Sequence, residues 1–239
     1  MKIIAHRGYS ADYAENTPQS WDAALAAGAH AIETDIRFSS DGIAVCAHDD
    51  DLDRLFGRPE RVSDVAWPEL EALESPNGAR IARLADVLAY AGNGHYVLLD
   101  LKDESPQALE RIWQIIVAEV PAAQHPLVIA GCHGLEAVRF FGARGATILG
   151  FIPAPDMAEA FWQAGATTIR LWEGDVSPAR VTTLQALGAE VWVTSGGDGT
   201  SFDGGDHNGT DMAGLAAIGV GGVLVNDVAL AVRQVASLG

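Results

Sequence analysis

Residues 18–36, PQSWDAALAAGAHAIETDI, contain the unit from which we predict the fold to be built. The Ala- and Leu-rich run Pro18–Ala27 is typical of a helix, and Gly28 is typical of the turn that ends one. The run Ala31–Ile36 is apolar and partly β-branched, as expected of a strand that is buried on both faces. A helix followed closely by a buried strand is the repeating element of parallel α/β folds.

The same alternation continues along the whole chain. We predict eight strands at Ile3–Ala5, Ala31–Ile36, Tyr96–Lys102, Leu127–Ala130, Thr147–Ile152, Thr168–Trp172, Glu190–Thr194 and Gly222–Val225. The helices predicted between them include Pro18–Ala27, Arg83–Ala91, Pro106–Val120, Asp156–Ala164 and Ala179–Leu187. Glycines that suit helix-ending turns follow at Gly28, Gly92, Gly165, Gly188 and Gly219. Thr17 and Ser105 each place a capping hydroxyl before a first-turn proline.

Eight such βα units predict a closed (β/α)8 TIM barrel. An open doubly wound sheet is the alternative fold. It is disfavoured because no glycine-rich phosphate-binding sequence follows the first strand.

Two stretches depart from the regular alternation. Residues 38–82 interrupt the second unit with a predicted hairpin strand, Ile43–His48, and a polar insertion at about residues 50–82. Residues 195–211 are rich in Asp and Gly but lack the closing Glu and flanking helices of an EF-hand, so we predict a mobile loop over the barrel mouth. Neither stretch is long enough for a separate domain. We therefore predict one barrel domain over residues 1–239 with a small insertion after the second strand.

The composition of the 239 residues, 49% hydrophobic and 20% charged, is typical of one soluble domain with a full core. The net charge of −17 makes nucleic acid an unexpected partner, and an anionic substrate would need local positive charge. No apolar run approaches the ~18–20 residues needed to span a bilayer. Because no charged and apolar leader precedes the first strand, we expect a cytoplasmic protein. The two cysteines, Cys46 and Cys132, do not suggest a disulfide framework.

Carboxylates stand at the ends of the second and third predicted strands. Residues two apart in a strand point the same way, so Glu33 and Asp35 project together, as do Asp100 and Lys102. Neighbouring strand ends in a barrel lie ~5 Å apart, so these groups can meet where such folds build active sites. Three carboxylates would repel one another without a cation, and an all-oxygen set selects Mg²⁺ or Ca²⁺ over zinc. A solvated rim or an ion pair is the plainer alternative.

Two histidines and an arginine lie close to these carboxylates in the predicted fold. His6 ends the first strand, Arg7 follows it, and His48 ends the hairpin strand. Two proton-transfer groups and a cation beside an acidic metal site suit phosphate-ester chemistry. A single strand-end histidine is more often structural, and Asn16 could simply cap the first helix. The functional prediction therefore depends on the histidines, the arginine and the carboxylates lying together at one end of the barrel.

A series of short motifs runs through the same part of the chain. The motifs are His6-Arg7-Gly8, Glu15-Asn16-Thr17, Glu33-x-Asp35, Asp41-Gly42, His48-Asp49, Leu52-x-Arg54 and Asp100-Leu101-Lys102, with Gly219–Val223 near the end. In order and spacing they resemble the glycerophosphodiester phosphodiesterases. The resemblance is dense over residues 3–102 and thin after them.

The resemblance implies a (β/α)8 barrel and a phosphoric diester hydrolase that releases glycerol 3-phosphate and an alcohol from glycerophosphodiesters. It implies one divalent ion, Mg²⁺ or Ca²⁺, bound by Glu33, Asp35 and Asp100. The other implied roles are general acid and base for His6 and His48, in either order, and phosphate binding for Arg7 and Lys102. We add Asn16 and Trp172 as predicted substrate contacts, with His133, Phe202 and His207 as weaker candidates for the pocket or its lid.

Three positions depart from the family pattern. Asp100 stands where the family usually has Glu, and the Thr-Thr that commonly follows the arginine is missing after Arg54. Residues 192–195, Trp-Val-Thr-Ser, stand where Trp-Thr-Val-Asn is common. Because no predicted catalytic charge is removed, these changes favour an altered substrate pocket over a loss of chemistry.

Three other functions fit parts of the pattern. A lyase that stops at a cyclic phosphate, as the related phospholipase D toxins do, is one alternative, although those toxins are secreted and contain disulfides. A noncatalytic barrel that only binds its ligand is another, against which the intact histidines and carboxylates speak. A barrel lyase acting on carboxylates is disfavoured by two histidines beside a single acidic site. The alcohol head group and a homo-oligomeric state stay open.

Overall fold

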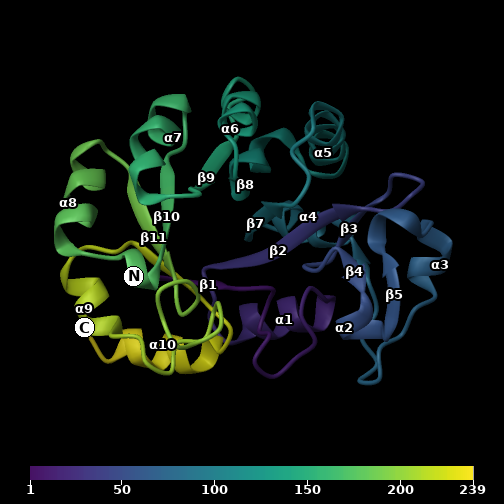
Figure 1. Cartoon of the computed structure of the whole chain (residues 1–239), viewed down its shortest axis with the longest axis horizontal. Coiled ribbons are helices and arrows are strands. Elements are labelled where there is room, and N and C mark those ends of the chain that lie inside the picture. The colour runs from purple at the N-terminus through teal and green to yellow at the C-terminus, as the bar shows by residue number, and fades with distance from the viewer. Residues whose placement is uncertain (239) are drawn as a thin grey trace.

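Eight parallel strands close into a barrel in the computed structural model, which describes residues 1–238 (Figure 1). The barrel closes because β1 pairs with both β2 and β12. In order around the ring the strands are β1 (Lys2–Ala5), β2 (Ala31–Phe38), β7 (Tyr96–Leu101), β8 (Val128–Cys132), β9 (Thr147–Phe151), β10 (Thr168–Trp172), β11 (Glu190–Thr194) and β12 (Gly222–Val225). The predicted (β/α)8 barrel is confirmed. Gly239, the last residue of the predicted domain, lies outside the described residues.

Helices alternate with these strands and form an outer layer around them (Figure 1). They are α1 (Pro18–Ala26), α4 (Leu84–Gly92), α5 (Pro106–Glu119), α6 (Leu135–Gly142), α7 (Ala158–Ala164), α8 (Pro178–Ala186), α9 (Met212–Ala217) and α10 (Val228–Ala236). Thr17 and Ser105 accept backbone N–H groups of Ser20 and Ala108, which confirms both predicted caps. Within residues 1–238 no helix is long and apolar enough to cross a membrane.

Most of the glycines predicted to end helices do so. Gly28, Gly165, Gly188 and Gly219 all have positive φ angles. Gly92 is the exception, because it is still the last residue of α4, and Gly94 takes the positive φ of 93° instead.

Alternate residues of each barrel strand point to opposite sides. Ile4 belongs to a small cluster inside the barrel, whereas Ile3 and Ala5 belong to the larger core between strands and helices. The inner cluster consists of Ile4, Ala31, Leu98, Ile129, Leu149, Phe151, Trp192 and Leu224. Residues separated from these by an even number of positions along a strand therefore face the barrel interior.

The insertion lies beside β2 and forms short elements around its own apolar cluster (Figure 1). The hairpin strand β3 (Ala44–Cys46) precedes it, and its own elements are β4 (Asp51–Leu52), α2 (Asp53–Phe56), β5 (Arg58–Arg61), α3 (Trp67–Glu71) and β6 (Ala82–Arg83). The predicted hairpin is confirmed, because β3 pairs antiparallel with β2 and places Cys46 opposite Ile36. The cluster consists of Val45, Leu52, Val62, Val65, Leu70 and Ile81, so the segment is less polar than its sequence suggested.

The Asp- and Gly-rich loop between β11 and α9 is tied to both neighbouring strand ends. The backbone N–H of Gly205 donates to the carbonyl of Ser195, and that of Asn226 donates to the carbonyl of Gly205, each at 2.7 Å. The loop therefore lies at the carboxyl end of the barrel, as predicted, while its mobility stays a prediction.

Candidate active site

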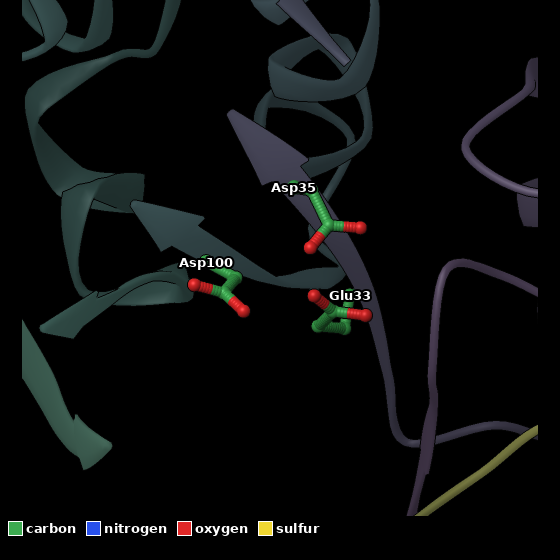
Figure 2. A group of neighbouring side chains, drawn as sticks. All are labelled: Glu33, Asp35 and Asp100. Carbon is green, nitrogen blue, oxygen red and sulfur yellow. The ribbon is translucent and has the colours of Figure 1, made fainter. Parts of the chain in front are cut away.

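Three buried carboxylates meet at the carboxyl ends of β2 and β7. Glu33 and Asp35 come from β2, and Asp100 lies opposite Asp35 in the register with β7. Figure 2 shows the three groups side by side. Their exposed fractions are 1%, 1% and 8%, and one oxygen of each lies within 4.8 Å of the others. The predicted convergence of the three side chains is thus seen in the structure.

Lys102 forms ion pairs with two of these carboxylates. Its ammonium lies 2.9 Å from Asp35 Oδ1 and 2.7 Å from Asp100 Oδ2. Burial opposes ionisation of both carboxyls, but the charge of Lys102 helps to hold the pKa of each below its usual range. For Asp100 a hydrogen bond of 2.6 Å from His133 Nε2 acts in the same direction. Lys102, predicted to contact phosphate, therefore contacts metal-ligand candidates in this structure.

Glu33 is the carboxylate with least positive charge around it. It accepts the backbone N–H of Arg7 at 2.6 Å. Burial, followed by the charges of Asp35 and Asp100, raises the pKa of Glu33 well above its usual value. The negative charges of its neighbours thus make Glu33 harder to ionise, and a bound cation would offset this repulsion. The donor set therefore fits a hard divalent ion such as Mg²⁺ or Ca²⁺.

His6 is held by a neutral partner. Its Nδ1 donates to Asn226 Oδ1 at 2.8 Å, and the amide orientation is set by the hydrogen bond from Asn226 Nδ2 to the Gly204 carbonyl at 3.2 Å. Burial and then the charge of Arg7 lower the pKa of His6 to about 4. His6 is therefore neutral at pH 7, with Nε2 able to accept a proton. Asn226 was missed in the sequence, although its place directly after the last barrel strand is a recognisable signal.

His48 is held by a charged network instead. Its Nδ1 lies 2.8 Å from Asp49 Oδ1, and Arg54 Nε donates to the other oxygen of Asp49 at 2.5 Å. Arg54 also donates to both oxygens of Glu15, at 2.9 and 2.7 Å. Burial disfavours the charged form of Asp49, but these partners hold its pKa below the usual value. The carboxylate of Asp49 therefore fixes the orientation of the His48 imidazole.

Asn16 positions Asp35 rather than capping α1. Its Nδ2 donates to Asp35 Oδ2 at 2.9 Å, and its Oδ1 accepts the hydroxyl of Thr34 at 2.7 Å. The cap is Thr17. Asn16 and Arg7 are the two non-glycine residues with positive φ among residues 1–238, at 57° and 58°. Such backbone strain commonly accompanies functional sites. A substrate contact of Asn16 stays a prediction.

The weaker candidates lie in different environments. Trp172 stacks on the guanidinium of Arg170, 3.9 Å from the ring centroid. Phe202 is 42% exposed, whereas His207 is buried. The pocket floor at Trp172 and the lid at Phe202 and His207 therefore stay predictions.

A cavity of about 210 Å³ opens beside His48, between the barrel and the insertion. One side carries polar groups that include Glu15, Asn16 and Asp49. The other side is apolar and includes Leu52, Leu55, Phe56 and Ile81. The cavity is large enough for a small organic group next to the imidazole.

Comparison with known proteins shows which family the first half of the chain is similar to. Residues 6–120 match the model of the glycerophosphoryl diester phosphodiesterase family, a stretch that contains both histidines, all three carboxylates and Lys102. The matched stretch is slightly less than half of the 239 residues. It is 39% identical over 70 residues to glycerophosphodiester phosphodiesterase from Bacillus altitudinis, covering 29% of each chain. It is 38% identical over 81 residues to human glycerophosphodiester phosphodiesterase 1, covering 34% of this chain and 24% of the human one.

The sequence matches to these relatives are partial, whereas the fold matches throughout. The chain spans less than half of the length of the curated relatives that it matches. A phosphodiesterase of Oleispira antarctica, whose structure contains the product sn-glycerol-3-phosphate, superposes with a TM-score of 0.82. That match covers 99% of this chain and 97% of the other at 19% identity, and thus shows the common barrel.

Proposed function

We propose that this protein is a metal-dependent phosphodiesterase that cleaves glycerophosphodiesters to glycerol 3-phosphate and an alcohol. The similarity of residues 6–120 to the glycerophosphoryl diester phosphodiesterase family supports the substrate class. The observation that carries the proposal is the pair of histidines with unlike partners, an amide for His6 and a carboxylate for His48, beside three buried carboxylates.

Glu33, Asp35 and Asp100 would hold one divalent ion, Mg²⁺ or Ca²⁺. The bound ion would supply positive charge that stabilises the developing charge on the phosphoryl oxygens. Asn16 keeps Asp35 in place through its amide, and His133 does the same for Asp100.

Arg7 is suited to bind the phosphoryl group. Its Nη1 lies 3.3 Å from Glu15 Oε1, and its buried Nε lies 3.6 Å from Asp35 Oδ2 but makes no hydrogen bond within residues 1–238. A buried N–H without a partner is costly, so a phosphoryl oxygen would satisfy it. Lys102 adds a second cation, which it shares with Asp35 and Asp100.

The two imidazoles divide the proton transfers. His6 is neutral because its pKa is lowered, and its Nε2 accepts the proton of the nucleophile, which is either water or the 2-hydroxyl of the glycerol. His48, whose Nδ1 is held by Asp49 and whose ring lines the cavity, donates a proton to the leaving alkoxide. The alcohol then occupies the cavity that His48 lines.

The experiment is a panel of glycerophosphodiesters with choline, ethanolamine, glycerol and inositol head groups, assayed after EDTA treatment and after addition of Mg²⁺ or Ca²⁺. We expect no turnover in EDTA and restored turnover with metal, with ³¹P NMR showing linear glycerol 3-phosphate. Equal turnover with EDTA would contradict the metal role. Accumulation of a cyclic phosphate would favour the lyase alternative.

The proposal also covers the substrate size, the location and the domain organisation of the protein. We propose a small-molecule substrate, a cytoplasmic location and a single barrel domain with its insertion at about residues 50–82. A homo-oligomer is compatible with all of these features.

A further inference from the structure

Arg170 is a buried cation whose charge is not matched by any hydrogen-bonded acid. Its side chain is 7% exposed, and its Nε and Nη1 have no hydrogen-bond partner within residues 1–238. Arginine is almost never buried without a paired acid, because the desolvation of the guanidinium is then uncompensated. An unsatisfied buried donor of this kind calls for a ligand or another specific explanation.

The topology places Arg170 on the barrel wall across from the carboxylates. Counted in either direction around the ring, β10 is the fourth strand from β2. Arg170 faces the interior, because Ile169 and Leu171 on the same strand pack in the outer core. It lies in register with Phe151 on β9 and Trp192 on β11, both members of the inner cluster.

Aromatic rings hold the guanidinium in place. It lies 3.9 Å from the ring centroid of Trp172 and 4.9 Å from that of Phe151. Phe151 in turn stacks on His133, which donates to Asp100. The loop after β11 packs on Trp172 so closely that a Cβ at Gly197 would clash with its ring. Stacking orients a guanidinium but leaves the N–H groups at its edge free to bind oxygen atoms.

We propose that Arg170 is a substrate-binding residue of this site, and that its guanidinium donates hydrogen bonds to phosphoryl oxygens that face away from β2. The inference rests on the proposed function, since it names a further group of the same site. Burial lowers the pKa of Arg170 to about 10, which leaves the guanidinium charged at pH 7. Asp100 and Glu33 are among the carboxylates whose charges act on it, so it lies within electrostatic reach of the acidic cluster.

A purely structural arginine would behave differently from a ligand-binding one. Replacing a structural, paired arginine by methionine would destabilise the fold. Replacing an unpaired buried charge by an apolar side chain of similar length is neutral or stabilising, whereas the ligand loses charge-assisted hydrogen bonds. The two roles are therefore separated by measuring stability without ligand and affinity for ligand on the same variant.

The test is calorimetric titration of the metal-loaded protein with glycerol 3-phosphate and with inorganic phosphate, with glycerol as the neutral ligand. Arg170→Met should bind both phosphoryl ligands roughly tenfold to hundredfold more weakly, with unchanged metal affinity and a melting temperature at least that of the native protein. Arg144→Met is the matched control, because Arg144 also stacks on a ring, that of Phe140 at 3.6 Å, but on the outside of the barrel. The control should keep native affinity.

Phosphoryl affinity within twofold of native in Arg170→Met would overturn the inference, as would a native protein that binds neither phosphoryl ligand. If Arg170→Met does not fold, Arg170→Gln is measured instead, and native affinity in that variant overturns it equally. Failure of the proposed function looks different. A native protein that binds phosphate through Arg170 but cleaves no diester would refute the phosphodiesterase and keep the inference, whereas unchanged kcat/KM in an active Arg170→Met would refute the inference alone.

Discussion

The two walls of the barrel mouth differ in whether their buried charges are paired. On the acidic wall, formed by Glu33, Asp35 and Asp100, Lys102 and the Arg7 backbone each lie against a carboxylate. On the facing wall, Arg170 rests on aromatic rings, and its Nε and Nη1 donate to no partner within residues 1–238. Paired charges keep a geometry fixed, whereas an unpaired buried charge destabilises the fold until a ligand supplies its counterpart. The difference is the one expected for the proposed ligand, an anion bound between a cation site and a guanidinium.

The largest effect is expected on the acidic wall. Glu33→Gln keeps the size of the side chain but removes the charge of the carboxylate that most lacks a cation. We expect activity to fall by roughly 10³-fold or more, because the stabilisation supplied by a bound ion is several kcal/mol. The measurement is kcat/KM at saturating Mg²⁺ or Ca²⁺. Glu136→Gln, at an exposed position on α6, is the control and should keep native activity. A fully active Glu33→Gln would remove the acidic wall from the mechanism.

Removal of either imidazole comes next. His6→Ala and His48→Ala should each lower kcat by roughly 10²–10⁴-fold, the usual contribution of a positioned proton-transfer group. Unchanged melting temperatures would show that the fold survives. An alcohol of low pKa as the leaving group should partly rescue His48→Ala and not His6→Ala, because only the former is assigned to protonate it. Rescue of His6→Ala instead would reverse the assignment of acid and base.

The partner of His6 sets the pH dependence. Since the base must be deprotonated, kcat/KM should fall as pH decreases through the His6 pKa of about 4. Asn226→Asp puts a carboxylate in place of the amide and stabilises the imidazolium, so the acidic limb should move to higher pH. The pH profile of kcat/KM, together with an NMR titration of His6, measures the shift. An acidic limb that does not move in Asn226→Asp would contradict the role given to Asn226.

The smallest effect is expected in the network behind His48. Arg54→Gln removes the link between Asp49 and Glu15, but the side chain of Arg54 is 47% exposed, so solvent screens much of its charge. We expect a loss in kcat of only a few-fold, measured with the same diester. A loss as large as that of His48→Ala would mean that this ion pair, rather than Asp49 alone, orients the imidazole.

The barrel was predictable because its signals are local and repeated. Runs such as Thr168–Trp172 and Glu190–Thr194 are observed with the predicted bounds, since a strand buried on both faces is a continuous apolar stretch between turns. The insertion was less predictable. Its apolar residues, such as Leu52 and Leu70, are spaced irregularly through short elements and meet only in the folded chain.

The residues of the candidate site also fall into those that the sequence predicts and those that it does not. Glu33 and Asp35 could be placed together because the two-residue period of a strand fixes their direction. Asn226 and Arg170 were not found, since their roles depend on contacts with residues far away in the sequence, such as Gly204 for Asn226 and Phe151 for Arg170. In the sequence Arg170 is one charged residue in an apolar strand, and only its lack of a partner makes it informative.

The central claim is that the three carboxylates hold one cation on which the chemistry depends. Calorimetric titration of the EDTA-treated protein with Mg²⁺ and with Ca²⁺ tests it most directly, with native protein and Glu33→Gln compared under the same conditions. One ion bound per chain by the native protein, and none by the variant at the same concentrations, is the predicted result. Equal binding by both proteins, or no binding by the native protein, would contradict the account.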